Sequence, residues 1–114
     1  MDKINSYRTS AKEIIEYLGE LWNQPNDPIA GEVIIDNQKG HYLLFSNGWR
    51  NEEYRVYGCT VHIEVKSNGR VWLHHDGTDM EIGRLLMEKG IPKSDIVLGF
   101  HAPFQRADTE FAVS

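Results

Sequence analysis

The chain has 114 residues, with 12 Lys and Arg against 17 Asp and Glu, so its formal net charge is −5 at pH 7. Its 40% hydrophobic and 25% charged residues predict one soluble domain over residues 1–114, because a second core would bury too little apolar surface. No membrane span, secretory signal or cysteine pair is evident, which predicts a cytoplasmic protein, and the acidic balance argues against a protein that holds nucleic acid alone.

Residues 7–22 are predicted to form the first helix, because their apolar side chains recur at spacings of three and four. These side chains are Tyr7, Ala11, Ile14, Ile15, Leu18, Leu21 and Trp22. Asn5 or Ser6 is expected to cap the start of the helix. A loop is expected at residues 23–28, since Pro25 and Pro28 break any regular ladder.

A block of strands follows this loop. Alternation and turn signals predict strands at residues 32–36, 41–45, 54–66 and 70–75, with a turn or bulge at Asn47-Gly48. Alternation along the longest strand directs one set of side chains toward the core. This set is Tyr57, Cys59, Val61, Ile63 and Val65. The opposite face is expected to carry Thr60, His62, Trp72 and His74. Trp72 is expected to be covered by the second helix or by Phe111, and the alternative is that this face is a surface for self-association or for a partner.

A second helix is predicted at residues 78–89. Thr78 and Glu81 have the spacing of a capping box, and Gly90 supplies a left-handed stop. A last strand at residues 96–100 precedes an apolar patch at residues 111–113. The order of elements predicts an α+β fold: an antiparallel β-meander with an N-terminal helix and a second helix before the C-terminal strand.

The polar face of the strands raises the question of a metal site. His62 and Glu64 share a strand face, and His74 or Asp76 on the returning strand is expected opposite them, a set that suits zinc or manganese. None of these spacings is diagnostic, however, and a solvated polar face explains the same residues. A metal-dependent enzyme on this histidine-rich face is therefore the second alternative, while the favoured reading has no metal, cofactor or catalytic residue.

Two smaller motifs have ordinary structural explanations. Cys59 is expected to be a buried and inert thiol rather than a nucleophile. Asp76-Gly77-Thr78 lacks the Gly-Lys-Ser/Thr of a phosphate loop, and a turn that leads into a helix cap accounts for it.

The basic residues of the C-terminal third form at most a small patch. They are Arg84, Lys89, Lys93 and Arg106. Specific DNA-binding proteins make roughly 6–10 phosphate contacts, which four scattered cations on an acidic chain do not supply. The isolated protein is therefore predicted not to bind DNA specifically at physiological salt.

Several short segments, taken in their order and spacing, resemble one family. They are His41-Tyr42-Leu43-Leu44, Gly48-Trp49, Arg55-Val56-Tyr57-Gly58-Cys59 with His62, Asp76-Gly77-Thr78, Gly90-Ile91-Pro92-Lys93, Asp95-Ile96-Val97-Leu98, Phe100-His101 with Pro103, Arg106, and Thr109-Glu110-Phe111-Ala112-Val113. Together they resemble the XisI-like proteins, the fdxN-element excision controlling factors of cyanobacteria, over nearly the whole chain. His74-His75 departs from the Gln-plus-charged pair usual before Asp76, and Gly99 is a small-residue variant.

The resemblance implies a role in programmed DNA rearrangement, in which a site-specific recombinase excises an inserted element and this protein controls the excision. It also implies protein partners: a companion with a nuclease-like fold, the recombinase, or both, with DNA met only in a complex. Self-association into a homo-oligomer is compatible with it. The alternative is an antitoxin-like or inhibitory partner that masks a nuclease. The candidates for partner or DNA contact are Trp72, His62, His74, Arg84, Lys93, His101 and Arg106.

Overall fold

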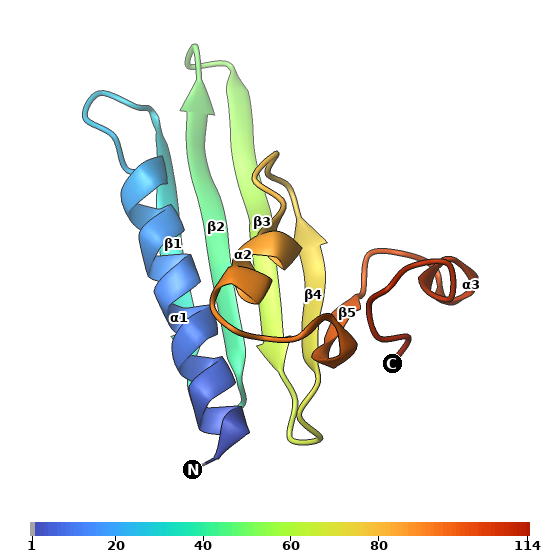
Figure 1. Cartoon of the computed structure of the whole chain (residues 1–114). Coiled ribbons are helices and arrows are strands. Elements are labelled where there is room, and N and C mark those ends of the chain that lie inside the picture. Colours follow the sequence, from blue (N-terminus) through green and yellow to red (C-terminus); the bar gives the residue numbers. More distant parts are fainter. Residues whose placement is uncertain (1) are drawn as a thin grey trace.

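The first element of the computed structural model, which describes residues 2–114, is the helix α1, Lys3–Trp22 (Figure 1). It begins earlier than predicted because the Asp2 carboxylate, rather than Asn5 or Ser6, accepts a hydrogen bond from the Ile4 N–H at 3.0 Å. Most of the predicted apolar side is buried, but Leu21 is exposed.

Five strands form one sheet in the order β1-β2-β3-β4-β5. Their bounds are β1 Ile29–Asp36, β2 His41–Arg50, β3 Tyr54–Val65, β4 Val71–Asp76 and β5 Ile96–Leu98. The first four strands are antiparallel neighbours, whereas β5 runs parallel to β4. The α+β class is thus confirmed, but the prediction of a purely antiparallel meander is wrong. The connection between β4 and β5 contains α2 and returns the chain to the end of the sheet where β4 starts, so that β5 runs in the same direction as β4.

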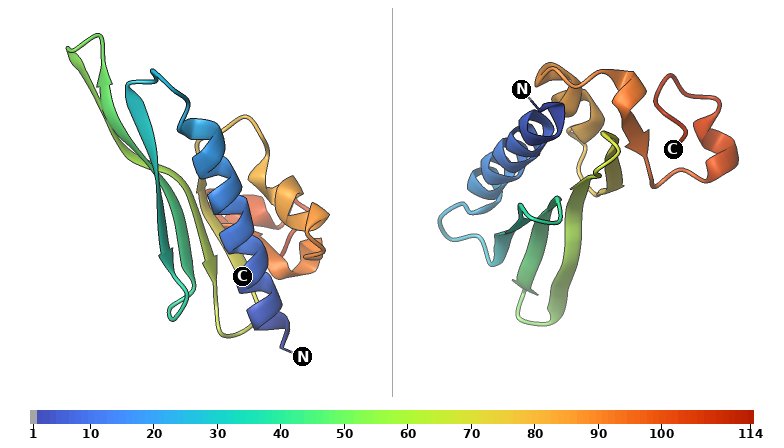
Figure 2. Two further views of the ribbon diagram at one scale, coloured as in Figure 1. Left: turned by 90° about the vertical axis from the view of Figure 1, so that its left-hand side faces the viewer. Right: turned by 90° about the horizontal axis from the view of Figure 1, so that it is seen from below.

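The hairpin of β2 and β3 is longer than predicted and turns later. Asn47-Gly48 lies inside β2, where a Cβ on Gly48 would meet the Pro28 carbonyl oxygen at 2.1 Å, so glycine serves close packing there rather than a turn. The turn instead follows Arg50, at Asn51 and Glu52, whose φ angles are 53° and 63°. As a result the hairpin projects past the other strands (Figure 2).

A β-bulge in β3 reverses the predicted alternation. Leu44 pairs with Val61, but its neighbour Phe45 pairs with Cys59, so Thr60 is an extra residue on β3. Consecutive residues of β2 face opposite sides, and Cys59 therefore lies on the face opposite Val61. The predicted inward set is correct for Val61, Ile63 and Val65 and wrong for Cys59 and Tyr57, of which Tyr57 is 63% exposed.

The second helix, α2 (Ile82–Glu88), is shorter than predicted, and it has no capping box. Glu81 has a φ of 55° and makes no side-chain cap, while the Asp76 carboxylate accepts hydrogen bonds from the N–H groups of Thr78 and Ile82, each at 2.9 Å. Gly90 ends this segment with a φ of 98°, the left-handed stop that was predicted.

The helices α1 and α2 pack on the same face of the sheet (Figure 2). The core between them and the sheet is made by buried side chains of α1, α2 and all inner strands: Ala11, Ile15, Leu18, Tyr42, Leu44, Val61, Ile63, Leu73, Ile82 and Leu86. After β5, which ends earlier than predicted, the chain forms the short helix α3, Pro103–Arg106, beyond the sheet edge. Within residues 2–114, no helix is both long and apolar enough to cross a membrane.

Candidate partner-binding face

The face of the sheet turned away from α1 and α2 carries a row of polar and aromatic side chains, which we call the open face. It comprises His41, Leu43, Phe45, Tyr57, Cys59, His62, Glu64, Trp72 and His74. Most are half-buried by one another rather than by a covering layer. The open face is thus the largest functional candidate, and it unites three residues predicted from sequence: His62, Trp72 and His74.

Three imidazole rings and one carboxylate form a bonded cluster on the open face. Nδ1 of His41 and Nε2 of His62 lie 3.0 Å apart, so one ring donates its N–H to the other. Nε2 of His74 donates to Oε1 of Glu64 at 2.8 Å, and the His62 and His74 ring centroids are 4.7 Å apart. His41 was missed from the sequence because only the pairing of β2 with β3 places it opposite Glu64.

Burial and mutual repulsion set the charges in this cluster. The pKa of His62 is lowered, first by burial and then by the neighbouring His74 and His41. Burial by itself would raise the pKa of Glu64, but the hydrogen bond from His74 and the nearby His41 and Lys66 lower it overall. The cluster therefore holds an ionised carboxylate beside a central neutral imidazole at neutral pH.

The predicted ligand arrangement is only partly present. His62, Glu64 and His74 share the face as expected, but Asp76 turns toward α2, where its oxygens accept hydrogen bonds from the backbone. Among residues 2–114, no group of three or more His, Cys, Asp or Glu side chains is arranged to hold a metal ion. His41 Nδ1, His62 Nε2 and His74 Nε2 are instead hydrogen-bonded within the cluster.

Trp72 is covered from within the chain, though not by the predicted elements. The Lys66 ammonium lies 4.4 Å from its ring centroid and the Arg106 guanidinium 5.0 Å, while His74 stacks beside it. Arg106 is held in place by the carbonyl oxygens of Gly99 and His101, at 3.3 and 3.1 Å. Phe111, by contrast, lies on the helix side, against α2. Arg106 is thus brought to the border of the open face, whereas His101 contributes only its carbonyl oxygen there and its ring lies against Phe100.

The other predicted cations lie elsewhere and are paired. Arg84 lies 3.7 Å from Glu81 and 3.9 Å from Glu88, and Lys89 lies 3.1 Å from Glu13. Lys93 forms a 2.7 Å pair with Glu110. Arg84 and Lys93 therefore do not join the open face, and the expected basic patch is neutralised by neighbouring carboxylates.

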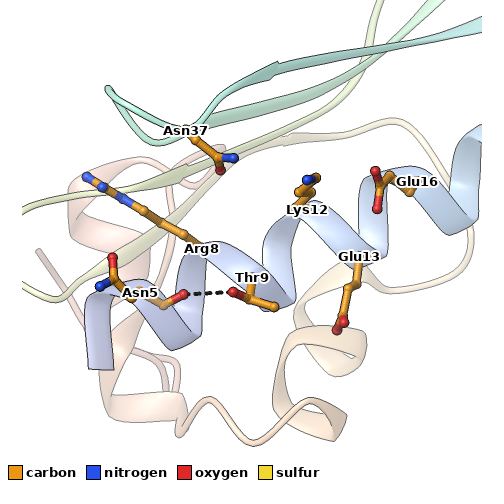
Figure 3. A pocket seen from close by; sticks show the side chains of 7 residues that line it. All are labelled: Asn5, Arg8, Thr9, Lys12, Glu13, Glu16 and Asn37. Carbon is orange, nitrogen blue, oxygen red and sulfur yellow. Dashed lines mark hydrogen bonds between the residues drawn. The ribbon is translucent and has the colours of Figure 1, made fainter. Parts of the chain in front are cut away.

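A separate pocket of about 420 Å³ lies between α1 and the β1–β2 turn (Figure 3). Arg8 and Lys12 contribute cations to it, but Glu13 and Glu16 contribute an equal number of carboxylates. The Arg8 Nε is buried and has no hydrogen-bond partner in the part of the chain from residue 2 to residue 114. This balance of charges selects no class of ligand, which leaves the open face as the stronger candidate.

Comparison with known proteins places this geometry in a family. A search of curated proteins gives no match. The crystal structure of an XisI-like protein from Anabaena variabilis ATCC 29413 superposes with a TM-score of 0.87 at 29% identity, covering 97% of this chain and 99% of that one. The fdxN element excision controlling factor XisI from the same organism gives 0.84 at 36% identity, covering 99% and 100%. The profile of the XisI protein family matches residues 1–113, so the chain belongs to the XisI family.

Proposed function

We propose that this protein controls the excision of an inserted DNA element and does so by binding a protein partner rather than by catalysis. The observation that carries the proposal is the 36% identity, over 99% of the chain, to a protein described as an excision controlling factor. Control of excision requires contact with the machinery that cuts and rejoins DNA, and protein contact is the route that the charges of this chain favour.

The chemistry of the open face supports a non-catalytic role. The rings hydrogen-bond to one another and to Glu64 through His41 Nδ1, His62 Nε2 and His74 Nε2, which leaves fewer imidazole nitrogens available to act as a general base. Burial raises the pKa of the Cys59 thiol, so this sulfur is protonated and weakly nucleophilic at neutral pH.

The distribution of cations supports a protein partner rather than direct DNA binding. Arg84, Lys89 and Lys93 each lie within 4 Å of a carboxylate. A phosphate would have to displace those carboxylates, and the net charge of −5 opposes its approach. Exposed and half-buried aromatic side chains on one sheet face are, in contrast, the usual anchors of protein interfaces.

An excision assay tests this proposal. A plasmid that carries the element and its recombinase is introduced into cells with and without this chain, and junction products are quantified. We expect the excision frequency to change when the chain is supplied, and the tagged chain to co-purify with the recombinase or with the nuclease-fold companion. Equal excision frequencies with and without the chain would contradict the proposal.

A further inference from the structure

The projecting part of β3 has one edge without a strand. Residues 54–59 pair with β2 on one side, whereas β4 pairs with β3 only from Val61 to Val65. The last contact before this gap is the Gly77 N–H, which donates to the Thr60 carbonyl at 2.7 Å. Figure 1 shows the hairpin continuing beyond the end of β4. We call residues 54–59 the free edge.

The backbone directions along the free edge follow from the other side of the sheet. The side-chain amide of Asn23 hydrogen-bonds to both the N–H and the C=O of Gly31, so these two backbone groups point away from β2. Backbone groups alternate sides along each antiparallel strand, and the observed pairing carries this alternation across β2 to β3. Arg55, Tyr57 and Cys59 therefore direct their N–H and C=O groups into the gap.

The free edge has little of the usual protection. β1, the other long edge, is blocked at Gly31 by Asn23, whereas residues 54–59 include no proline, lysine or acidic residue, and the bulge lies beyond them at Thr60. The one charged side chain on this edge, Arg55, lies over the rings of Trp49 and Tyr57. Tyr54 and Tyr57 are 66% and 63% exposed. A shallow hollow of about 310 Å³ runs along this edge, lined by Ser46 and residues 54–60. Such an edge accepts an added strand.

The charges at the hairpin tip indicate what kind of strand would fit. The Arg55 guanidinium lies over the rings of Trp49 and Tyr57, at 5.5 and 4.9 Å, and donates to the Gly48 carbonyl. Neither Arg55 nor Arg50 has a carboxylate within 4 Å among residues 2–114, whereas Lys3, Arg70, Arg84, Lys89 and Lys93 each have one. An incoming carboxylate thus has a cation to meet beside the free edge.

A second copy of the chain fits this edge poorly. In an antiparallel pairing of two copies through Arg55, Tyr57 and Cys59, the two Tyr57 residues lie opposite each other. Glu53 of the second copy then lies opposite Val61 of the first. That position is already occupied by Asp76 of β4, so the approach meets both an occupied strand position and a like charge. A strand from a different protein avoids this conflict because it can end before Thr60.

We propose that the free edge binds an extended segment of a protein partner, which adds to the sheet beside Arg55–Cys59 and carries an acidic side chain toward Arg55. The backbone of the segment pairs with Arg55, Tyr57 and Cys59, while its apolar side chains lie against Tyr57 and Phe45. This inference rests on the proposed function for the existence of a partner, and it names the surface through which that partner is bound.

The test compares three variants of the full-length chain in calorimetric titrations with the nuclease-fold companion or the recombinase. Tyr57→Pro removes one outward N–H and spares the pairing with β2, and Arg55→Glu reverses the charge. Tyr54→Thr is the matched control, since Tyr54 is equally exposed but its backbone faces β2. Thermal melts verify that each variant folds. We expect Tyr57→Pro and Arg55→Glu to weaken binding by about tenfold or more, and Tyr54→Thr by less than about twofold.

A second measurement separates failure of this inference from failure of the proposed function. The probe is an extended Thr/Val-rich octapeptide with a central Glu, and its control replaces the Glu with Lys. In spectra of the ¹⁵N-labelled chain, we expect the Glu peptide to shift the amides of Arg55, Tyr57 and Cys59 more than the Lys peptide does. Companion binding that is insensitive to Tyr57→Pro, absence of amide shifts at these residues, or a dimer of the chain that Tyr57→Pro dissolves would each overturn the inference.

Discussion

At the scale of single residues, Asp95 joins segments that are far apart in the sequence. Its buried carboxylate accepts a hydrogen bond from the Tyr7 hydroxyl at 2.5 Å and ion pairs with Lys3 at 3.3 Å and Arg70 at 3.1 Å. α1, the start of β4 and the turn before β5 are thereby fastened at one point. The same contact raises the pKa of Tyr7 to about 12, by burial first and by the bond to Asp95 second.

Asp95→Asn is expected to lower the free energy of unfolding by about 1.5–3 kcal/mol, because the buried Tyr7 hydroxyl loses a charged acceptor while the partly exposed Lys3 and Arg70 lose an ion pair that water can partly replace. Urea denaturation measures this loss. Glu110→Gln is the matched control, since the Lys93–Glu110 pair is on the surface, and it should leave the unfolding midpoint unchanged. Equal midpoints for wild type and Asp95→Asn would contradict the role given to Asp95.

The stabilisation by Asp95 should depend on pH. Burial by itself would raise the pKa of this carboxyl, but the hydrogen bonds from Tyr7 and Lys3 and the charge of Arg70 lower it below the ordinary value of 3.8. A group whose pKa is lower in the folded state stabilises fully above its unfolded pKa and loses that effect as the pH falls through the folded pKa. Denaturation from about pH 6 down to about pH 2 should therefore show a steeper loss of stability for wild type than for Asp95→Asn.

Ile63 tests the core at the same scale. Its side chain is fully buried on β3, beneath the helices. Ile63→Ala should cost about 2–5 kcal/mol, the range for emptying a core position, whereas Ile34→Ala at a 45% exposed position of β1 should cost far less. A loss under about 0.5 kcal/mol for Ile63→Ala in denaturant melts would put this residue outside the core.

At the scale of elements, Asp76 organises the entry to α2. Its carboxylate accepts hydrogen bonds from the Thr78 N–H, the Thr78 hydroxyl and the Ile82 N–H. Asp76→Ala should weaken α2 by about 1 kcal/mol, the usual value of a helix cap, and should speed amide exchange in residues 82–88. Glu81→Ala should leave amide exchange in α2 unchanged, because the Glu81 side chain makes no capping bond. Faster exchange in Glu81→Ala together with unchanged exchange in Asp76→Ala would instead support the capping box predicted from the sequence.

The elements also show how far the sequence determined the fold. Local signals placed α1, the hairpin strands and the Gly90 stop, since each depends on nearby residues. The bulge at Thr60 and the parallel partner of β4 depend on pairing between distant segments, which no local pattern encodes. For the same reason, strand alternation predicted that His62 and His74 share a face, but no local pattern predicted that His41 joins them or that the free edge exists. The cap from Asp76 is local, but the Thr78–Glu81 spacing of a capping box concealed it.

At the scale of the whole molecule, charge and shape separate two kinds of contact. On the helix side, Arg84, Lys89 and Lys93 are already paired with carboxylates, and the net charge is −5. The opposite side presents aromatic and histidine side chains and continues into the projecting hairpin. A molecule built in this way is suited to hold another protein and poorly suited to hold a duplex unaided.

A mobility-shift titration at about 0.15 M salt tests the central claim most directly. The DNA carries the border sequence of the element, and the lanes compare this chain alone, the companion or recombinase alone, and both together. We predict no specific shift by this chain alone up to about 10 µM, and a further retardation of the partner–DNA complex when this chain is added. Sub-micromolar, sequence-dependent binding by this chain alone would contradict the account, and Lys93→Ala and Arg106→Ala would then locate the contact.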